Sequence, residues 1–265
     1  LGGGFWVLSR HHDVQSVSRD YARFRSFEGP SIREDPRLNG LTIVSMDPPQ
    51  HARFRRLISA GFTPRMTAAL DSQARDWAVK IVEAALERGE CNFVHDIAYQ
   101  LPMHMIADIV GVPADDRAWL FERADVLLQA TDPESFLTAE ETAAVQLEIY
   151  EYGKALGAEK RRAPADDIWT LLTKAEVEQP DGTRTTLSEF ELDLFFSLLI
   201  LAGSETTRGA ISSGLLALLQ HPAEMDKLRS ATEMPASAVD EILRWSTPVT
   251  YFRRTAAQDV ELHGM

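Results

Sequence analysis

The pattern of apolar and polar positions predicts a mainly helical protein. Apolar residues recur at helical spacing along much of the chain, as at Leu70, Trp77, Ile81 and Ala84. Proline, glycine and capping signals mark where these periodic segments begin and end. We expect helices over 12–24, 48–60, 64–88, 93–110, 114–130, 139–161, 166–176, 189–219, 222–230 and 235–246.

Two capping boxes support the placement of the helix starts. Thr138 with Glu141 and Ser188 with Glu191 both have the spacing at which a hydroxyl and a carboxylate satisfy each other's backbone N–H groups. The remaining chain predicts small β pieces and one long loop. We expect strands at 5–8, 251–255 and 260–262, a hairpin over 177–187, and a Gly- and Pro-rich loop over 27–45.

The most apolar stretch, residues 190–219, contains a polar interruption at its centre. The run ends at Gly203 and meets Ser204, Glu205 and Thr206, although a buried carboxylate costs several kcal/mol unless it is paired or hydrogen-bonded. The hydroxyl of Thr206 can bond to the carbonyl of Ala202 four residues back, and Glu205 beside it can relay protons. Gly203 lets a bulky group approach the backbone. The alternative is a kinked helix in which Glu205 pairs with Arg208.

Two further pairs could carry chemistry or hold structure. Glu241 and Arg244 are three apart on a helix whose apolar neighbours predict partial burial, where a broken pair would be costly. His51 and Arg55 lie four apart on one helix face, and both can donate hydrogen bonds to a carboxylate. Arg53, Arg56 and Arg65 surround them, so this basic segment could bind an acidic cofactor or partner; the alternative is a solvated basic helix.

Composition narrows the possible functions. The 265 residues are 45% hydrophobic and 25% charged, as in ordinary globular proteins, and the net charge of -13 makes nucleic acid an improbable partner. The single cysteine, Cys91, excludes a disulfide framework or a multi-thiolate metal site within these residues. We expect 190–219 not to span a membrane, because its centre is polar and charged.

Taken in order, these motifs closely resemble the cytochrome P-450 family, the haem-thiolate monooxygenases. AGSETT at 202–207 resembles the family's oxygen-activating helix motif, and EILR at 241–244 matches its Glu-x-x-Arg motif. HARFR at 51–55 matches the His-x-x-x-Arg that binds the haem propionates. Arg254, in the apolar segment near the C-terminal end, falls where a further propionate-binding arginine of the family lies.

The resemblance implies a fold, a reaction and a set of roles. The fold would be the mainly α cytochrome P-450 fold, with a long central helix, a helical bundle and small β pieces, as one incomplete domain over 1–265. Glu205 and Thr206 would be catalytic, delivering protons to oxygen. The resemblance assigns haem binding to His51, Arg55, Ala202, Gly203 and Arg254, and a structural role to Glu241 and Arg244.

The same resemblance implies cofactors and partners. An enzyme of this type holds haem b and inserts one atom of O2 into a C–H bond of a hydrophobic small molecule such as a steroid, terpenoid or fatty-acyl-like compound. Electrons would come from NAD(P)H through a ferredoxin reductase and a ferredoxin. The motif style is that of bacterial, cytoplasmic members without a membrane anchor.

One departure from the family pattern is large. The family's iron ligand is a cysteine in a loop well downstream of Glu-x-x-Arg, whereas the surroundings of Cys91 do not resemble that loop. The chain also begins and ends in mid-pattern, so we expect it to be truncated at both ends, to lack a metal ligand and to be inactive by itself. The alternative is a truncated, non-catalytic helical domain that binds no haem.

Overall fold

The computed structural model describes residues 4–32, 36–130, 134–179 and 181–264. It divides into two compact units, which are described separately. Unit 1 comprises Leu1–Arg56 and Tyr251–Met265, and unit 2 comprises Leu57–Thr250. The prediction that the two units form a single domain stays a prediction.

Unit 1 joins the two ends of the chain through a small antiparallel sheet. Its elements are α1 (His11–Arg19), β1 (Phe24–Arg25), η1 (Pro36–Leu38), η2 (Ile43–Ser45), the first part of α2 (Gln50–Gly61) and β4 (Thr255–Ala256). Phe24 of β1 pairs with Ala256 of β4. The carboxylate of Asp47 accepts the backbone N–H of Ser26 at 2.8 Å and thereby fixes the segment after β1 against the start of α2.

Three expectations for unit 1 are wrong. Residues 5–8 form no strand, and the first helix ends at Arg19 rather than at 24. Near the C-terminal end, where strands were expected over 251–255 and 260–262, the paired strand is Thr255–Ala256. Strand identity depends on a partner that the local pattern does not reveal. Of the loop predicted over 27–45, residues 33–35 lie outside the described part, and short 3-10 turns lie within the remainder.

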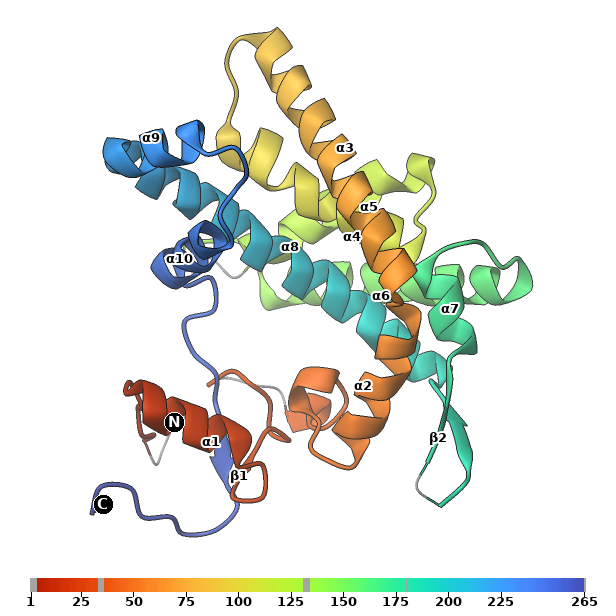
Figure 1. Cartoon of the computed structure of the whole chain (residues 1–265). Helices are drawn as coiled ribbons and strands as arrows, with labels where there is room; N and C mark the ends of the chain where they lie inside the picture. Colours follow the sequence, from red (N-terminus) through yellow and green to blue (C-terminus); the bar gives the residue numbers. More distant parts are fainter. Residues whose placement is uncertain (1–3, 33–35, 131–133, 180, 265) are drawn as a thin grey trace. The chain divides into compact units, whose positions relative to one another are not determined.

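Unit 2 is a bundle of helices with one hairpin, as the sequence predicts (Figure 1). Pro64 opens α3 and Gly89, in the left-handed conformation, caps its end. Both predicted capping boxes are present, at Thr138 and at Ser188. The helices are α3 (Pro64–Arg88), η3 (a π-helical turn, Val94–Ala98), α4 (Gln100–Val110), α5 (Ala114–Gln129), α6 (Ala139–Arg162), α7 (Ile168–Lys174), α8 (Glu189–Gln220), α9 (Pro222–Ser230) and α10 (Ala236–Ser246), and β2 (Glu176–Glu178) pairs with β3 (Arg184–Thr186).

The long helix α8 organises the core of unit 2. It contacts α4, α5, α6, α9, α10 and η3, and Figure 1 shows it running through the bundle. Leu192, Phe196 and Ile200 are almost fully buried on it, and Trp169 of α7 packs edge-on against Phe196 with ring centroids 5.7 Å apart. By length and composition alone α8 could also cross a membrane. Glu205 and Arg208 near its centre argue against that, because charged residues are costly at bilayer depth.

Candidate functional site

The polar interruption lies inside α8, and the helix is continuous through it. The hydroxyl of Ser204, which is fully buried, donates to the carbonyl of Ile200 at 2.7 Å. The hydroxyl of Thr206 donates to the carbonyl of Ala202 at 2.8 Å, which is the bond that the sequence predicts. Each hydroxyl is therefore satisfied one turn back along the same helix, so these polar side chains need no partner from another element.

Glu205 has a different environment from the two hydroxyls. Its side chain is exposed, as is the neighbouring Ala202, while Thr206 is partly exposed. Within the described ranges no ion pair joins Glu205 to Arg208, so the pairing expected in the kinked-helix alternative is wrong. An acid and a hydroxyl thus lie on adjacent positions at the open side of an otherwise apolar helix, where a cofactor or substrate can approach.

Gly203 faces a neighbouring helix. A methyl group built at this position would come within 2.9 Å of Cδ1 of Ile106 on α4. The close packing of α4 against α8 therefore explains why residue 203 is a glycine, independently of any cofactor. Gly209, two turns further along α8, would meet nothing within 4 Å. The role in cofactor binding that the resemblance assigns to Gly203 stays a prediction.

The Glu241–Arg244 pair forms, but it is not buried. Nε of Arg244 donates to Glu241 at 2.6 Å and a second guanidinium nitrogen donates at 2.7 Å. The Arg244 guanidinium holds the pKa of the Glu241 carboxyl below its usual value. The two side chains are 58% and 65% exposed, so the expected burial of this pair is wrong in this structure, although α10 itself packs on α8, where a methyl group built at Gly214 would meet Ile242. An exposed pair adds little to stability, and its apolar neighbours Leu243 and Trp245 are also exposed.

The predicted carboxylate-binding cations lie in unit 1. His51 and Arg55 are one turn apart on α2; Arg55 is exposed and His51 partly exposed, and neither side chain has a recorded partner in the described part of the chain. Arg254 donates from its guanidinium to the carbonyl of Arg253 at 2.8 Å and lies over the ring of Phe252. These side chains can donate hydrogen bonds to carboxylates such as those of a haem.

The described residues supply no evident iron ligand. They contain no cluster of three or more His, Cys, Asp or Glu side chains that could hold a metal ion. Cys91 is exposed in the connection between α3 and η3, among polar residues. The chemistry of the residues present fits the carboxylate groups and the oxygen side of a haem.

One cluster near α4 was missed by the sequence analysis. His104 stacks on Trp77 of α3 with ring centroids 3.8 Å apart, and its Nδ1 is buried without a hydrogen-bond partner. The only sequence signal was a histidine in the apolar run of 101–110, which is more often a core residue than a functional one. The cluster lines a cavity that is analysed below.

Comparison with known proteins relates the chain to monooxygenases. No family model matches it. It is 37% identical over 270 residues to a steroid C26-monooxygenase of Rhodococcus jostii, covering 99% of this chain and 55% of that protein. It is 36% identical over 270 residues to a methyl-branched lipid omega-hydroxylase of Mycobacterium bovis, covering 99% of this chain and 62% of that protein. The chain thus spans little more than half the length of these curated relatives.

Solved structures agree with the sequence relatives. The cytochrome P450 CYP268A2 of Mycobacterium marinum, solved in complex with pseudoionone, superposes with a TM-score of 0.86 at 36% identity, covering 99% of this chain and 64% of that one. This likeness confirms the predicted fold class, a mainly helical chain with small β pieces.

The contact at Gly203 can be tested by a pair of substitutions. We expect Gly203→Ala to leave the free energy of unfolding nearly unchanged, because about 1 kcal/mol gained in helix propensity is offset by the contact with Ile106. Ile106→Val removes the methyl group that would be contacted. In that background Gly203→Ala should stabilise the chain by about 1 kcal/mol, measured by urea denaturation.

Gly209→Ala is the matched control, because it adds the same methyl group to the same helix in open space. It should stabilise the chain by about 1 kcal/mol in both backgrounds. If Gly203→Ala has the same effect in the wild-type background as in the Ile106→Val background, the packing explanation of Gly203 fails.

Proposed function

Because the chain belongs to the cytochrome P-450 family, we propose that the protein is a haem-dependent monooxygenase, which inserts one atom of O2 into a C–H bond of a hydrophobic small molecule. The observation that carries this proposal is the polar cluster of α8. A hydroxyl and an exposed carboxylate, Thr206 and Glu205, interrupt a long apolar helix, and among the described residues the acid has no ion-pair partner. A core helix has no structural need for that arrangement.

The roles of these two side chains follow from their hydrogen bonds and exposure. The hydroxyl of Thr206 donates its proton to the carbonyl of Ala202. Its oxygen can still accept a hydrogen bond from another donor, and a small rotation of the side chain would free the O–H to donate elsewhere. Glu205 is exposed and can exchange protons with solvent. Together they can hold and pass protons to a group that approaches the open side of α8.

A bound haem b would supply the activation of O2, and the protein's own residues would bind and orient it. We assign the propionate carboxylates to His51, Arg55 and Arg254, because these cations are wholly or partly accessible and their side chains are not engaged by acids. Ala202 and Gly203 are short enough to let a flat ring approach α8. The thiolate ligand would come from a cysteine outside these residues, since Cys91 lies in an exposed, polar connection.

The class of substrate is supported by the named relatives. One of them is a steroid C26-monooxygenase, another hydroxylates methyl-branched lipids, and the structural relative was solved with pseudoionone. A steroid, terpenoid or fatty-acyl-like molecule is therefore the proposed substrate. We also propose a bacterial, cytoplasmic enzyme that receives electrons from NAD(P)H through a ferredoxin reductase and a ferredoxin. The alternative of a non-catalytic helical domain without haem gains no support from these relatives.

The proposal of a haem-thiolate enzyme is tested by the optical spectrum of the full-length gene product. We expect the reduced protein with CO to give the absorption band typical of thiolate-bound haem, because a cysteine must ligate the iron. Cys91→Ser should leave that band unchanged, since this thiol is exposed and outside the proposed site. Absence of the band in the full-length protein, or its loss in Cys91→Ser, would contradict the assignment.

The role of Thr206 is tested by Thr206→Ala in the same haem-loaded protein. O2 consumption should persist while product falls by about tenfold or more and peroxide rises, because misdirected protons release reduced oxygen without inserting it. Thr207→Ala is the matched control, since Thr207 is the exposed neighbour on the same helix turn. An unchanged ratio of product to O2 consumed in Thr206→Ala would remove Thr206 from the mechanism.

The basic face of α2 is the proposed docking surface for the ferredoxin. Arg56 is exposed on a chain whose net charge is -13, so a local cationic surface can steer an acidic partner. Arg53 lies on the same helix in unit 1, whereas Arg65 lies on α3 in unit 2. The docking surface is therefore assigned to the residues of α2.

Charge reversal tests this surface. Arg56→Glu should slow reduction by ferredoxin about tenfold at low ionic strength and flatten the dependence of that rate on salt, as stopped-flow absorbance would record. Arg229→Glu, an equal charge change at an exposed position of α9, should have little effect. Equal effects of the two reversals would show that only net charge matters and would refute the docking assignment.

A further inference from the structure

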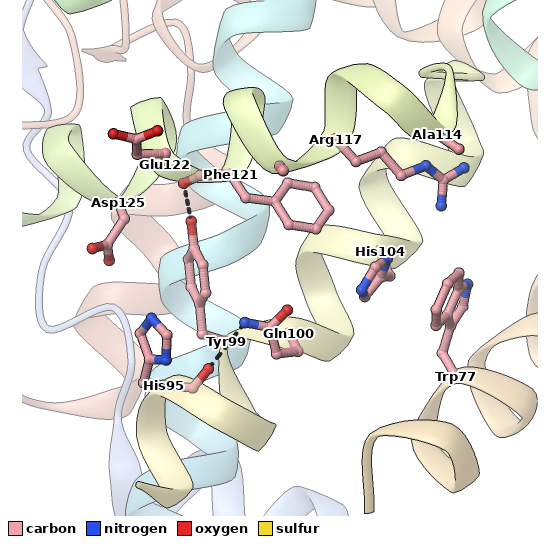
Figure 2. Close-up of a pocket in the computed structure, with 11 residues that line it drawn as sticks. Trp77, His95, Tyr99, Gln100, His104, Ala114, Arg117, Phe121, Glu122 and Asp125 are labelled. Carbon is pink, nitrogen blue, oxygen red and sulfur yellow. Dashed lines mark hydrogen bonds between the residues drawn. The ribbon is translucent and has the colours of Figure 1, made fainter. Parts of the chain in front are cut away.

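A cavity of about 630 Å³ lies between α3, α4 and α5 of unit 2, apart from the polar cluster of α8 (Figure 2). Its walls are largely aromatic, and Tyr99 and Phe121 contribute buried rings. The π-helical turn η3 supplies one wall and places His95 at the cavity. Single π-turns are uncommon and often occur at functional sites, and nothing in the proposed monooxygenase role uses this one.

His104 provides an unused hydrogen-bonding atom at one end of the cavity. Its ring is held between Trp77, stacked at 3.8 Å, and Phe121, edge-on at 5.1 Å. Burial lowers the pKa of His104, and the positive charge of Arg117 lowers it further against the opposing charge of Asp108, which favours the neutral imidazole. Its Nδ1 is buried and has no partner, although leaving a buried polar atom unsatisfied costs about 1–3 kcal/mol.

Arg117, at the same end, is already engaged. Its guanidinium donates to Asp108 at 2.7 Å and to the carbonyl of Val112 at 3.2 Å. Asp108 also accepts a hydrogen bond from the indole N–H of Trp77 at 2.7 Å, which holds the Arg117–Asp108 pair in place at the cavity wall. The positive charge of Arg117 is therefore matched by Asp108, and it offers an incoming anion little attraction.

The opposite end of the cavity is acidic. Figure 2 shows Asp125 and Glu122 on the side away from Arg117 and Trp77, with Tyr99 and Phe121 between the two ends. Asp125 is partly buried, and its recorded partner is a neutral amide, that of Gln129 at 2.8 Å. Asp125 is close enough to Tyr99 for its charge to help burial raise the pKa of that phenol. Among the described residues no ion pair joins a cation to Asp125, although the positive charge of Arg208 is near enough to Tyr99 to act against the rise in its pKa.

We propose that this cavity binds a small aromatic amine, with its ring against Tyr99 and Phe121, its ammonium group at Asp125 and a ring N–H donated to Nδ1 of His104. Aromatic walls with an unmatched carboxylate are the chemistry that recognises organic cations. An organic anion would meet Asp125 and Glu122 and would find Arg117 already paired. The elongated arrangement of acceptor site, aromatic wall and acid selects a flat ring that carries both an N–H and an amine.

Tryptamine is the probe, because its flat indole ring carries an N–H and a flexible aminoethyl arm that ends in an ammonium group. Its binding is followed in full-length protein by the NMR resonance of the Trp77 indole N–H, assigned with Trp77→Phe, which reports on this cavity independently of any haem. We expect a saturable shift with tryptamine. Indole-3-acetate, which replaces the ammonium by a carboxylate, should bind at least about tenfold more weakly.

Two variants test which side chain contacts each polar group of the ligand. Asp125→Asn should weaken tryptamine binding about tenfold, as loss of a charge-assisted hydrogen bond requires, whereas Asp226→Asn on α9 should not change it. In the wild-type protein 1-methyltryptamine, which lacks the ring N–H, should bind several-fold more weakly than tryptamine. His104→Phe keeps the aromatic stack and should abolish that difference.

The proposal is overturned if tryptamine causes no saturable shift at Trp77, or if indole-3-acetate binds as tightly as tryptamine. It is also overturned if Asp125→Asn and Asp226→Asn have equal effects. Should His104→Phe fail to fold, equal affinities of tryptamine and 1-methyltryptamine in the wild-type protein would by themselves refute the role of His104. None of these outcomes depends on monooxygenase activity.

Discussion

The hydrogen bonds from hydroxyl side chains to carbonyls one turn back are the interaction on which α8 depends. Ser204 bonds to Ile200 and Thr206 to Ala202, and Ser197 bonds in the same way to Asp193 at 3.2 Å. Without these bonds, polar groups inside this long apolar helix would each cost free energy on burial. Because they are satisfied locally, α8 can remain unbroken from Glu189 to Gln220, carry the core of unit 2 and still present Glu205 on its open side.

Burial separates the two kinds of ionisable group in this chain. Glu205, Glu241 and Arg244 are exposed, so their charges are well solvated and cost little. Partly buried groups are instead held by hydrogen bonds or ion pairs within unit 2, as Asp108 is by Trp77 and Arg117. His104 and Asp125 are not held in this way, because His104 has an unsatisfied buried nitrogen and, among the described residues, no ion pair joins a cation to Asp125. The proposed binding site depends on finding both groups at one cavity.

Much of the helical architecture was predictable from local signals. Pro64, Gly89 and the capping boxes at Thr138 and Ser188 act within one turn of the chain, so they place helix ends without knowledge of the fold. The strands of unit 1 were predicted poorly, because β1 and β4 exist only through pairing between residues more than two hundred positions apart, whereas the hairpin of β2 and β3, whose turn is local, was predicted. The burial of the Glu241–Arg244 pair was also predicted wrongly: apolar neighbours predict that α10 packs on another element, as it does on α8, but they do not determine which of its side chains that contact covers.

The sequence by itself determined the helical class, the bond from Thr206 to Ala202 and the identity of the motifs, because these depend on residue type and on separations of three or four positions. Only the tertiary structure decided that Gly203 faces Ile106, that Glu205 lacks the ion pair with Arg208, and that His104 meets Trp77 beside a cavity. Those facts depend on which helix faces meet, and the faces that meet are chosen by packing among segments distant in the chain, which no local spacing encodes.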